Sequence, residues 1–358
     1  MSSCAAWTTI SVISGSGNGY TLPVGRSLRL VFAFVALASA TVQAQTSSWT
    51  PPRAPDGHVD LQGVWLNNSA TPLERPKALE GRSLLTDEEV ATLKARAARL
   101  FNDTDSDFAA GDNVFLAALG NVDIFKNPGT TENFVGMIPR WFDNRTSLIV
   151  DPPDGRIPPQ TPEAQKRLAA AAAAARPRAG DGPESFNNAY RCITTGVPKL
   201  GGLYGAGHFG YYQIVQTSSY AVILTETIHD ARIVPLDGRP HVPQSVRFWN
   251  GDSRGRWEGD ALVVDTTNFS DKSNFMGSAG GLHLRERFTR VAADTVRYEI
   301  TITDPATWTK PWTAVVLLKQ SADRIYEWAC HEGNRPMEGM LSGARADDKA
   351  AEESAKPR

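Results

Sequence analysis

The chain has 358 residues, of which 41% are hydrophobic and 21% are charged, and its formal net charge is −2. This composition is typical of a globular protein and excludes a largely disordered or collagen-like chain. Because no run of five or more lysine or arginine residues occurs, the sequence shows no electrostatic footprint for nucleic acid or for an anionic membrane surface.

The N-terminus predicts export. A short basic segment, Arg26–Arg29, precedes an apolar run, Leu30–Ala40, and small residues follow up to Ala44. This is the order of a secretory signal peptide cleaved after Ala44, and the run is too short for a membrane span. Residues 1–23 are polar and lie outside this pattern, so we hypothesise that translation starts near Val24. We expect a periplasmic or extracellular protein without a membrane span in its mature form.

Residues 45–180 are predicted to contain an extended arm, a first strand and a helical insertion. The arm, residues 45–60, is rich in serine, threonine and proline. Thr86 and Glu89 form a capping box that starts a helix. A second helix starts at Thr161, with a proline at its first position, and stops before Pro177. We therefore place a helical insertion at about residues 86–180, with irregular chain and one short strand between its helices.

A regular series of short strands is predicted after residue 210. The strands are rich in β-branched and aromatic residues, are separated by turns, and cover Tyr211–Thr217, Ala221–Ile228, Arg232–Pro235, Val246–Trp249, Ala261–Asn268, Leu282–Arg290, Val296–Thr303, Thr313–Lys319 and Ile325–His331. Such spacing predicts an antiparallel meander, either a barrel or a β-sandwich. We expect one mainly β domain over residues 61–344, with α insertions, and a disordered charged tail over residues 345–358.

The cysteines predict one disulfide bond. Once the leader is removed, the chain retains only Cys192 and Cys330. Two cysteines in an exported protein favour a bond between them, and the alternative is a pair of separate buried thiols.

Three of the predicted strands each carry a histidine and a glutamate close together. They are the segments Thr225–His229, His283–Arg287 and Glu327–Glu332. Side chains alternate between the two faces of a strand, so Glu286 shares the apolar face of residues 282–290, whereas His283 and Arg285 share the polar face. A single cavity therefore collects either the glutamates or the histidines.

Two functional interpretations follow, with a structural alternative. In the first, Glu226 and Glu286 are an acid–base pair inside an apolar barrel, where burial raises the pKa of a carboxyl group. In the second, His229, His283 and His331 form an acid–base or metal cluster on one wall. No HExxH motif or close His-x-His spacing supports a metal, and we expect no cofactor. In the structural alternative, the glutamates pair with arginines and the histidines face solvent.

Further side chains complete the predicted site. His229 and Asp230 end one strand at an expected barrel rim, either as a His–Asp pair at a pocket mouth or as turn residues. The candidate catalytic residues are Glu286, Glu226, His229, His331 and Arg285, and the candidate ligand contacts are Trp249, Tyr298, Trp328, Asp230 and His283. Tryptophans can also form a platform for a sugar, although they more often fill a core.

Several segments resemble a family of uncharacterised exported bacterial proteins over nearly all of residues 50–345. The segments are residues 151–158, Arg191–Pro198, His229–His241, Gly251–Asp260, Val264–Phe269 and Tyr326–Asn334. The family has no established activity to carry over. The Gly63-x-Trp65 start, with the meander, is more distantly similar to lipocalin and calycin barrels, which implies a ligand cavity.

We therefore expect an exported barrel that binds a small, largely apolar or cyclic organic molecule. The enzymatic version of this interpretation is acid–base chemistry of a lyase, isomerase or hydratase type, with Arg285 stabilising negative charge. The alternatives are a non-catalytic periplasmic carrier and a carbohydrate-binding or envelope-interaction module.

Overall fold

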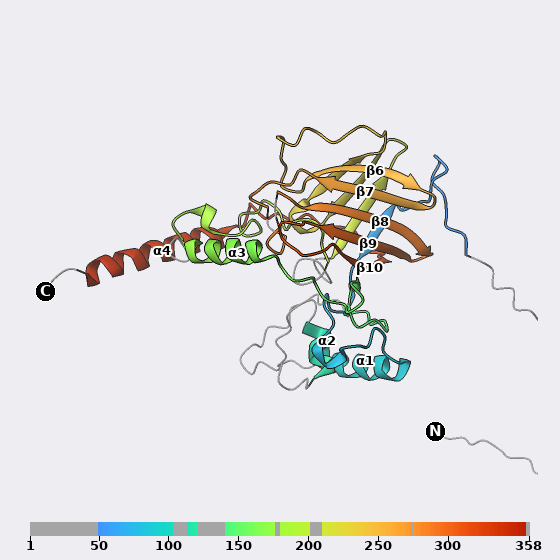
Figure 1. Cartoon of the computed structure of the whole chain (residues 1–358), viewed down its shortest axis with the longest axis horizontal. Coiled ribbons are helices and arrows are strands. Elements are labelled where there is room, and N and C mark those ends of the chain that lie inside the picture. Colours follow the sequence, from blue (N-terminus) through green and yellow to red (C-terminus); the bar gives the residue numbers. More distant parts are fainter. Residues whose placement is uncertain are drawn as a thin grey trace, which may run out of the picture. The chain divides into compact units, whose positions relative to one another are not determined.

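A computed structural model describes residues 49–102, 113–120, 140–175, 180–200, 210–273, 275–278 and 280–355. The predicted leader and its cleavage site lie outside these residues. The described chain is mainly antiparallel β, as predicted, with one ten-stranded sheet curved into a nearly closed barrel (Figure 1). In the described ranges, no helix combines the length and the apolar character needed to cross a lipid bilayer.

The strands follow one another around the barrel with one insertion. They are β1 Gly63–Leu66, β2 Ile149–Asp151, β3 Tyr211–Gln216, β4 Tyr220–Thr225, β5 Ala231–Pro235, β6 Asp252–Glu258, β7 Ala261–Thr267, β8 His283–Ala292, β9 Thr295–Thr303 and β10 Trp312–Gln320. The sheet order is β5-β4-β3-β1-β10-β9-β8-β7-β6, and β2 pairs with β10 outside this path. Strand β1 thus joins the start of the meander to its last strand.

The two edge strands, β5 and β6, meet by side-chain packing at Gly255. A Cβ atom at Gly255 would lie 2.6 Å from Cδ2 of Leu236 and 2.8 Å from Cγ1 of Val234. Only a residue without a side chain allows β6 this close to β5, so Gly255 helps to close the barrel.

The barrel interior is a packed core. Leu284, Glu286 and Phe288 of β8 are buried while Arg285 is exposed, which confirms the predicted assignment of the two faces. The alternation of β9 is also confirmed, because Val296, Tyr298, Ile300 and Ile302 are all buried. Trp65 is fully buried under the guanidinium group of Arg290, near the C-terminal end of β8.

The helices are α1 Asp87–Asn102, α2 Asn113–Leu119, α3 Pro162–Ala175 and α4 Arg335–Ser354. The predicted capping box is confirmed at the start of α1, where the Glu89 N–H donates to Oγ1 of Thr86 (3.2 Å) and the Thr86 N–H donates to Oε2 of Glu89 (2.8 Å). Helices α1 and α2 pack in a second apolar cluster that includes Leu79, Phe115 and Phe142.

Two sequence predictions after residue 320 differ from the structure. No strand forms over Ile325–His331, because β10 ends at Gln320 with β1 and β9 already paired along its two edges. Helix α4 occupies most of the predicted disordered tail. Asn334 caps its N-terminus by accepting a hydrogen bond from the Met337 N–H, and a proline lies in the first turn.

Candidate functional site at the mouth of the barrel

An ion pair crosses the barrel interior. Arg232 of β5 donates two hydrogen bonds to Glu286 of β8, one from Nη1 to Oε2 (2.6 Å) and one from Nη2 to Oε1 (3.0 Å). The Tyr298 hydroxyl also donates to Oε1 of Glu286. The side chain of Glu286 is 0% exposed and that of Arg232 is 8% exposed. Both oxygens of the predicted catalytic carboxylate therefore have partners inside the core.

Tyrosines complete this interior network. Burial, followed by the nearby charge of Glu286, raises the pKa of both Tyr212 and Tyr298. Both hydroxyls therefore stay protonated at neutral pH and act as donors, with Tyr212 donating to the backbone oxygen of Lys199 (3.0 Å). Phe288 stacks on Tyr298 with 4.5 Å between the ring centroids. Tyr298, a predicted ligand contact, is thus a core residue.

Glu226 and Glu286 lie on different sides of the sheet. Besides burial, the charge of Glu286 raises the pKa of Tyr212. The pKa of the neighbouring Tyr211 is raised by burial and then by the charges of Asp323 and Glu226. Tyr211 and Tyr212 are consecutive residues of β3, so their side chains point to opposite faces. Strand β4 ends at Thr225, and Oε2 of Glu226 then accepts a hydrogen bond from the Tyr326 N–H (3.2 Å). The predicted glutamate pair is therefore not brought together in one cavity.

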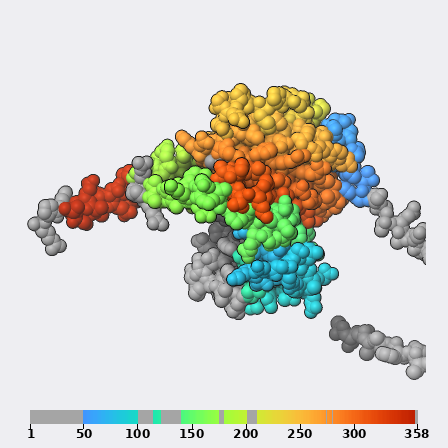
Figure 2. All heavy atoms as spheres, in the orientation of Figure 1, coloured from blue at the N-terminus to red at the C-terminus, as the bar shows by residue number. Residues whose placement is uncertain are grey.

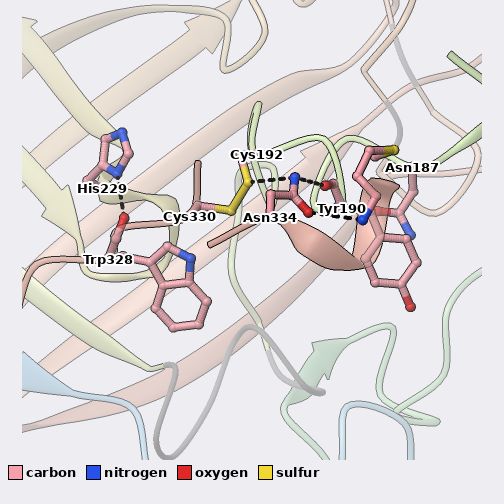
Figure 3. The surroundings of a disulfide bond; sticks show 8 residues. Asn187, Tyr190, Cys192, His229, Trp328, Cys330 and Asn334 are labelled. Carbon is pink, nitrogen blue, oxygen red and sulfur yellow. Dashed lines mark hydrogen bonds between the residues drawn. A yellow bond between two sulfur atoms is a disulfide. The ribbon is translucent and has the colours of Figure 1, made fainter. Parts of the chain in front are cut away.

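The three predicted histidines lie in different surroundings. Nδ1 of His229 lies 3.1 Å from the backbone oxygen of Trp328 beside the disulfide (Figure 3). His283 lies on the outer face of the barrel, with its Nε2 3.1 Å from Oδ1 of Asp265, and His331 is exposed in a turn. In the described part of the chain, no three histidine, cysteine or carboxylate side chains lie together as a group able to hold a metal ion.

Arg285 belongs to a charged network on the outer face. Its Nη2 atom lies 3.1 Å from Oε1 of Glu258, which also pairs with Arg256 and Arg287. In the view of Figure 2, the atoms of strands β6 to β10, coloured yellow to orange, form one continuous surface. Arg285 thus lies among surface ion pairs on the outer face of β8, whereas the buried Glu286 lies on the inner face.

A pocket lies at the end of the barrel opposite Trp65. It lies at Leu282, just before β8 begins, whereas Arg290 and Trp65 lie at the other end of that strand. Its volume is about 230 Å³. Its apolar wall is formed by Val197, Trp249, Phe269, Phe275 and Leu282, and its polar wall includes Asn187, Asn188, Thr194, Thr195 and Ser273. Of the five predicted ligand contacts, Trp249 is the one in this wall.

A cluster of polar side chains supports the polar wall. Oγ1 of Thr194 lies 2.8 Å from Oδ2 of Asp230 and 2.8 Å from Oδ1 of Asn250. Nζ of Lys199 donates to the Thr195 hydroxyl and, at 3.4 Å, to the backbone oxygen of Thr227. Thr194 and Thr195 thus lie between the pocket and two charged groups, the half-buried carboxylate of Asp230 and the buried amine of Lys199.

Burial shifts the pKa values of both charged groups toward neutrality. It lowers the pKa of Lys199 to about 8, and the carboxylate of Asp230 partly opposes that shift. It raises the pKa of Asp230, while hydrogen bonds from Thr194 and the attraction of Lys199 act in the opposite direction. A lysine with a pKa of about 8 exchanges protons readily near neutral pH.

The disulfide attaches the C-terminal segment to this end of the barrel. Cys192 is bonded to Cys330 across 138 positions of the sequence, as predicted. Beside it, Nδ2 of Asn334 donates to the backbone oxygen of Tyr190 (2.9 Å) and contacts Sγ of Cys192 (3.4 Å), as Figure 3 shows. The loop that carries Thr194 and Thr195 therefore starts at a covalent anchor.

Sequence reasoning missed Thr195 and Lys199. Lys199 lies in the apolar run Val197–Leu200, where Val197 and Leu200 are also buried. A lysine between buried apolar residues is uncommon, because burial disfavours its charged form. That local pattern was a usable signal. The apolar wall had no comparable signal, because its residues come from distant segments.

Similarity to known proteins adds no further information about this site. Comparisons with family models, with curated proteins and with solved structures find no match for this chain.

Proposed function

We propose that this protein is exported and binds a small, largely apolar organic molecule in the pocket at the mouth of the barrel. The observation that carries the proposal is the composition of that pocket, in which Trp249, Phe269 and Phe275 face a polar wall. Ligand sites typically combine apolar and aromatic walls with a few polar groups that orient the ligand. The Cys192–Cys330 disulfide supports export, because such bonds persist in oxidising compartments.

The size of the pocket favours a ligand of about one aromatic ring. Pockets for drug-sized ligands measure roughly 300–1,000 Å³, and this pocket, at about 230 Å³, is smaller. The barrel interior offers a poorer site, because Glu286, Phe288 and Tyr298 fill it and contact one another. In this proposal the groups available for acid–base chemistry are Lys199 and Asp230.

The tryptophans favour a pocket over a sugar platform. Trp308 and Trp312 are buried in the core, and Trp257 is stacked on His58 with 4.6 Å between the ring centroids. Trp249 contributes instead to the concave wall beside Phe269. A planar ligand can stack on Trp249 in the pocket.

Binding of p-nitroanisole to the mature chain, residues 45–358, tests the proposal. We expect quenching of tryptophan fluorescence and a one-to-one complex in native mass spectrometry. Ala189 lines the pocket and is half-buried, so Ala189→Trp should fill the space and abolish binding. The matched control is Ala293→Trp, at an exposed position in the β8–β9 turn. Equal binding by the wild type and Ala189→Trp would place the ligand elsewhere and contradict the proposal.

A further inference from the structure

A hydroxyl and an amine meet at the wall of the pocket. Thr195 lines the pocket and is half-buried, and its hydroxyl accepts a hydrogen bond from Nζ of Lys199. Lys199 is 5% exposed, so bulk water has little access to its side chain. An alcohol within hydrogen-bond reach of a buried amine is one of the arrangements that activates a nucleophile.

The carboxylate of Asp230 is the third group of this arrangement, and it attracts the amine of Lys199. Asp230 accepts a hydrogen bond from the Thr194 hydroxyl, at 2.8 Å, and a backbone hydrogen bond from Thr195. Its carboxylate attracts Lys199 electrostatically, and the carbonyl oxygen of Thr227 accepts from Nζ of Lys199. The Thr227 carbonyl and the charge of Asp230 together therefore take the part of the orienter in a nucleophile–base–orienter triad.

We propose that Thr195 is a nucleophile and Lys199 its general base, in an acyl-transfer reaction on small aromatic or apolar esters held in this pocket. The proposal rests on the proposed function, because the ester must bind beside Trp249 and Phe269. Asp230 is a positioning residue that acts through Lys199.

The reaction is balanced as a two-step hydrolysis. In its neutral form Lys199 takes the proton of the Thr195 hydroxyl while Oγ1 forms a bond to the ester carbonyl carbon. The carbon–oxygen bond to the leaving alcohol then breaks, and the Lys199 ammonium group returns the proton to the leaving oxygen. Water next attacks the acyl-threonine with Lys199 again as base, which releases the acid and restores Thr195.

The pocket wall also holds an amide of the kind that stabilises an oxyanion. Oδ1 of Asn187 accepts a hydrogen bond from the Tyr190 N–H at 2.9 Å, which fixes the orientation of this side-chain amide. Asn187 and Thr195 both line the pocket. Amide donors fixed in this way lower the barrier by stabilising the charge that develops on the carbonyl oxygen.

The interior carboxylate does not offer the same chemistry. Both oxygens of Glu286 accept hydrogen bonds from Arg232, and Tyr298 donates to one of them. Its side chain is 0% exposed, and it does not belong to the pocket wall. The Thr195–Lys199 pair adjoins a space that a substrate can enter.

Hydrolysis of p-nitrophenyl acetate by the mature chain, with acid-quenched mass spectrometry, tests the inference. We expect turnover and an acetyl group on the peptide that contains Thr195. Thr195→Ala should lose both, and Thr195→Ser should keep both. Lys199→Met should lower kcat/KM by about 10²–10⁴-fold. The wild-type rate should rise with pH to a plateau above about pH 8, where burial makes Lys199 neutral.

Two neighbouring exposed residues provide matched controls. Thr309→Ala and Lys310→Met make the same chemical changes outside the pocket and should keep the wild-type rate.

Binding of p-nitroanisole separates the two proposals. If Thr195→Ala binds it normally and hydrolyses the ester as fast as the wild type, the nucleophile is wrong while the proposed function stands. If the wild type binds neither compound, both proposals fail.

Discussion

The protein has two buried charged side chains with different surroundings, one inside the barrel and one at its mouth. Inside, Glu286 is held by Arg232 and Tyr298, and every partner is itself buried. At the mouth, Lys199 contacts the Thr195 hydroxyl next to a pocket of about 230 Å³. The interior group is thus enclosed by its own partners, whereas the mouth group contacts a residue of the pocket wall.

This difference shows that burial of a charge is a weak indicator of chemistry by itself. A buried ion pair with complete hydrogen bonds holds elements together, and Arg232 and Glu286 connect β5 to β8 across the interior. A catalytic group needs in addition a position that the substrate can reach and a pKa near the working pH. Only the mouth cluster combines these features among the sites described above.

Removing the interior carboxylate should have the largest effect. In Glu286→Gln the charge of Arg232 stays buried without its counter-charge, so we expect the free energy of unfolding to fall by about 3–5 kcal/mol. Denaturation with urea measures this change. Hydrolysis of p-nitrophenyl acetate by the protein that remains folded should be retained, because Glu286 does not belong to the pocket wall.

A double variant provides the control for this experiment. Arg232→Met combined with Glu286→Leu removes both charges and should recover most of the lost stability. If Glu286→Gln is instead as stable as the wild type and inactive, Glu286 is the catalytic acid or base, and the comparison between the two regions is reversed.

Removing the disulfide should have the next largest effect and should act on the mouth. Cys192→Ser with Cys330→Ser opens a loop that spans 138 positions, so we expect a loss of about 2–4 kcal/mol in the free energy of unfolding. Affinity for p-nitroanisole should also fall, because the loop of Thr194 and Thr195 loses its anchor. Urea denaturation and fluorescence titration measure the two changes. Unchanged affinity would show that the pocket is ordered without this bond.

The lysine at the mouth should make stability depend on pH. Because burial lowers the folded-state pKa of Lys199 to about 8, the unfolded chain binds more protons than the folded chain above that pH. The free energy of unfolding of the wild type, compared with that of Lys199→Met at the same pH, should therefore rise by about 1 kcal/mol between pH 7 and 9. Urea denaturation of both proteins at the two pH values measures it. A constant difference would show that Lys199 is solvated in the folded state.

Local signals in the sequence predicted the fold and the disulfide but did not reveal the mouth site. Capping by Thr86 and the alternation around Glu286 depend on neighbours within one element, and both predictions are confirmed. The segment around Trp328 was predicted wrongly as a strand, because its residue types favour a sheet, whereas β10, which precedes it, already pairs with β1 and β9.

The candidate site depends on contacts between distant segments. Pairing of Arg232 with Glu286 spans 54 positions, and contact between Thr194 and Asp230 spans 36. Arginine partners for the glutamates were one alternative that the sequence offered, but nothing in the sequence indicates which arginine faces which acid. The pocket wall likewise exists only after the barrel has closed, since Trp249 and Leu282 come from different segments.

The outer face should give the smallest effect and completes the comparison. Arg285 is 52% exposed and pairs with Glu258 on a surface that also carries Arg256 and Arg287. Exposed ion pairs are screened by water and salt, so Arg285→Ala should change the free energy of unfolding by at most about 0.5 kcal/mol. Hydrolysis of p-nitrophenyl acetate should stay at the wild-type rate. A tenfold loss of that rate in a stably folded Arg285→Ala protein would move the site to the outer face, beside His283, because neither the interior nor the mouth contacts this side chain in the structure.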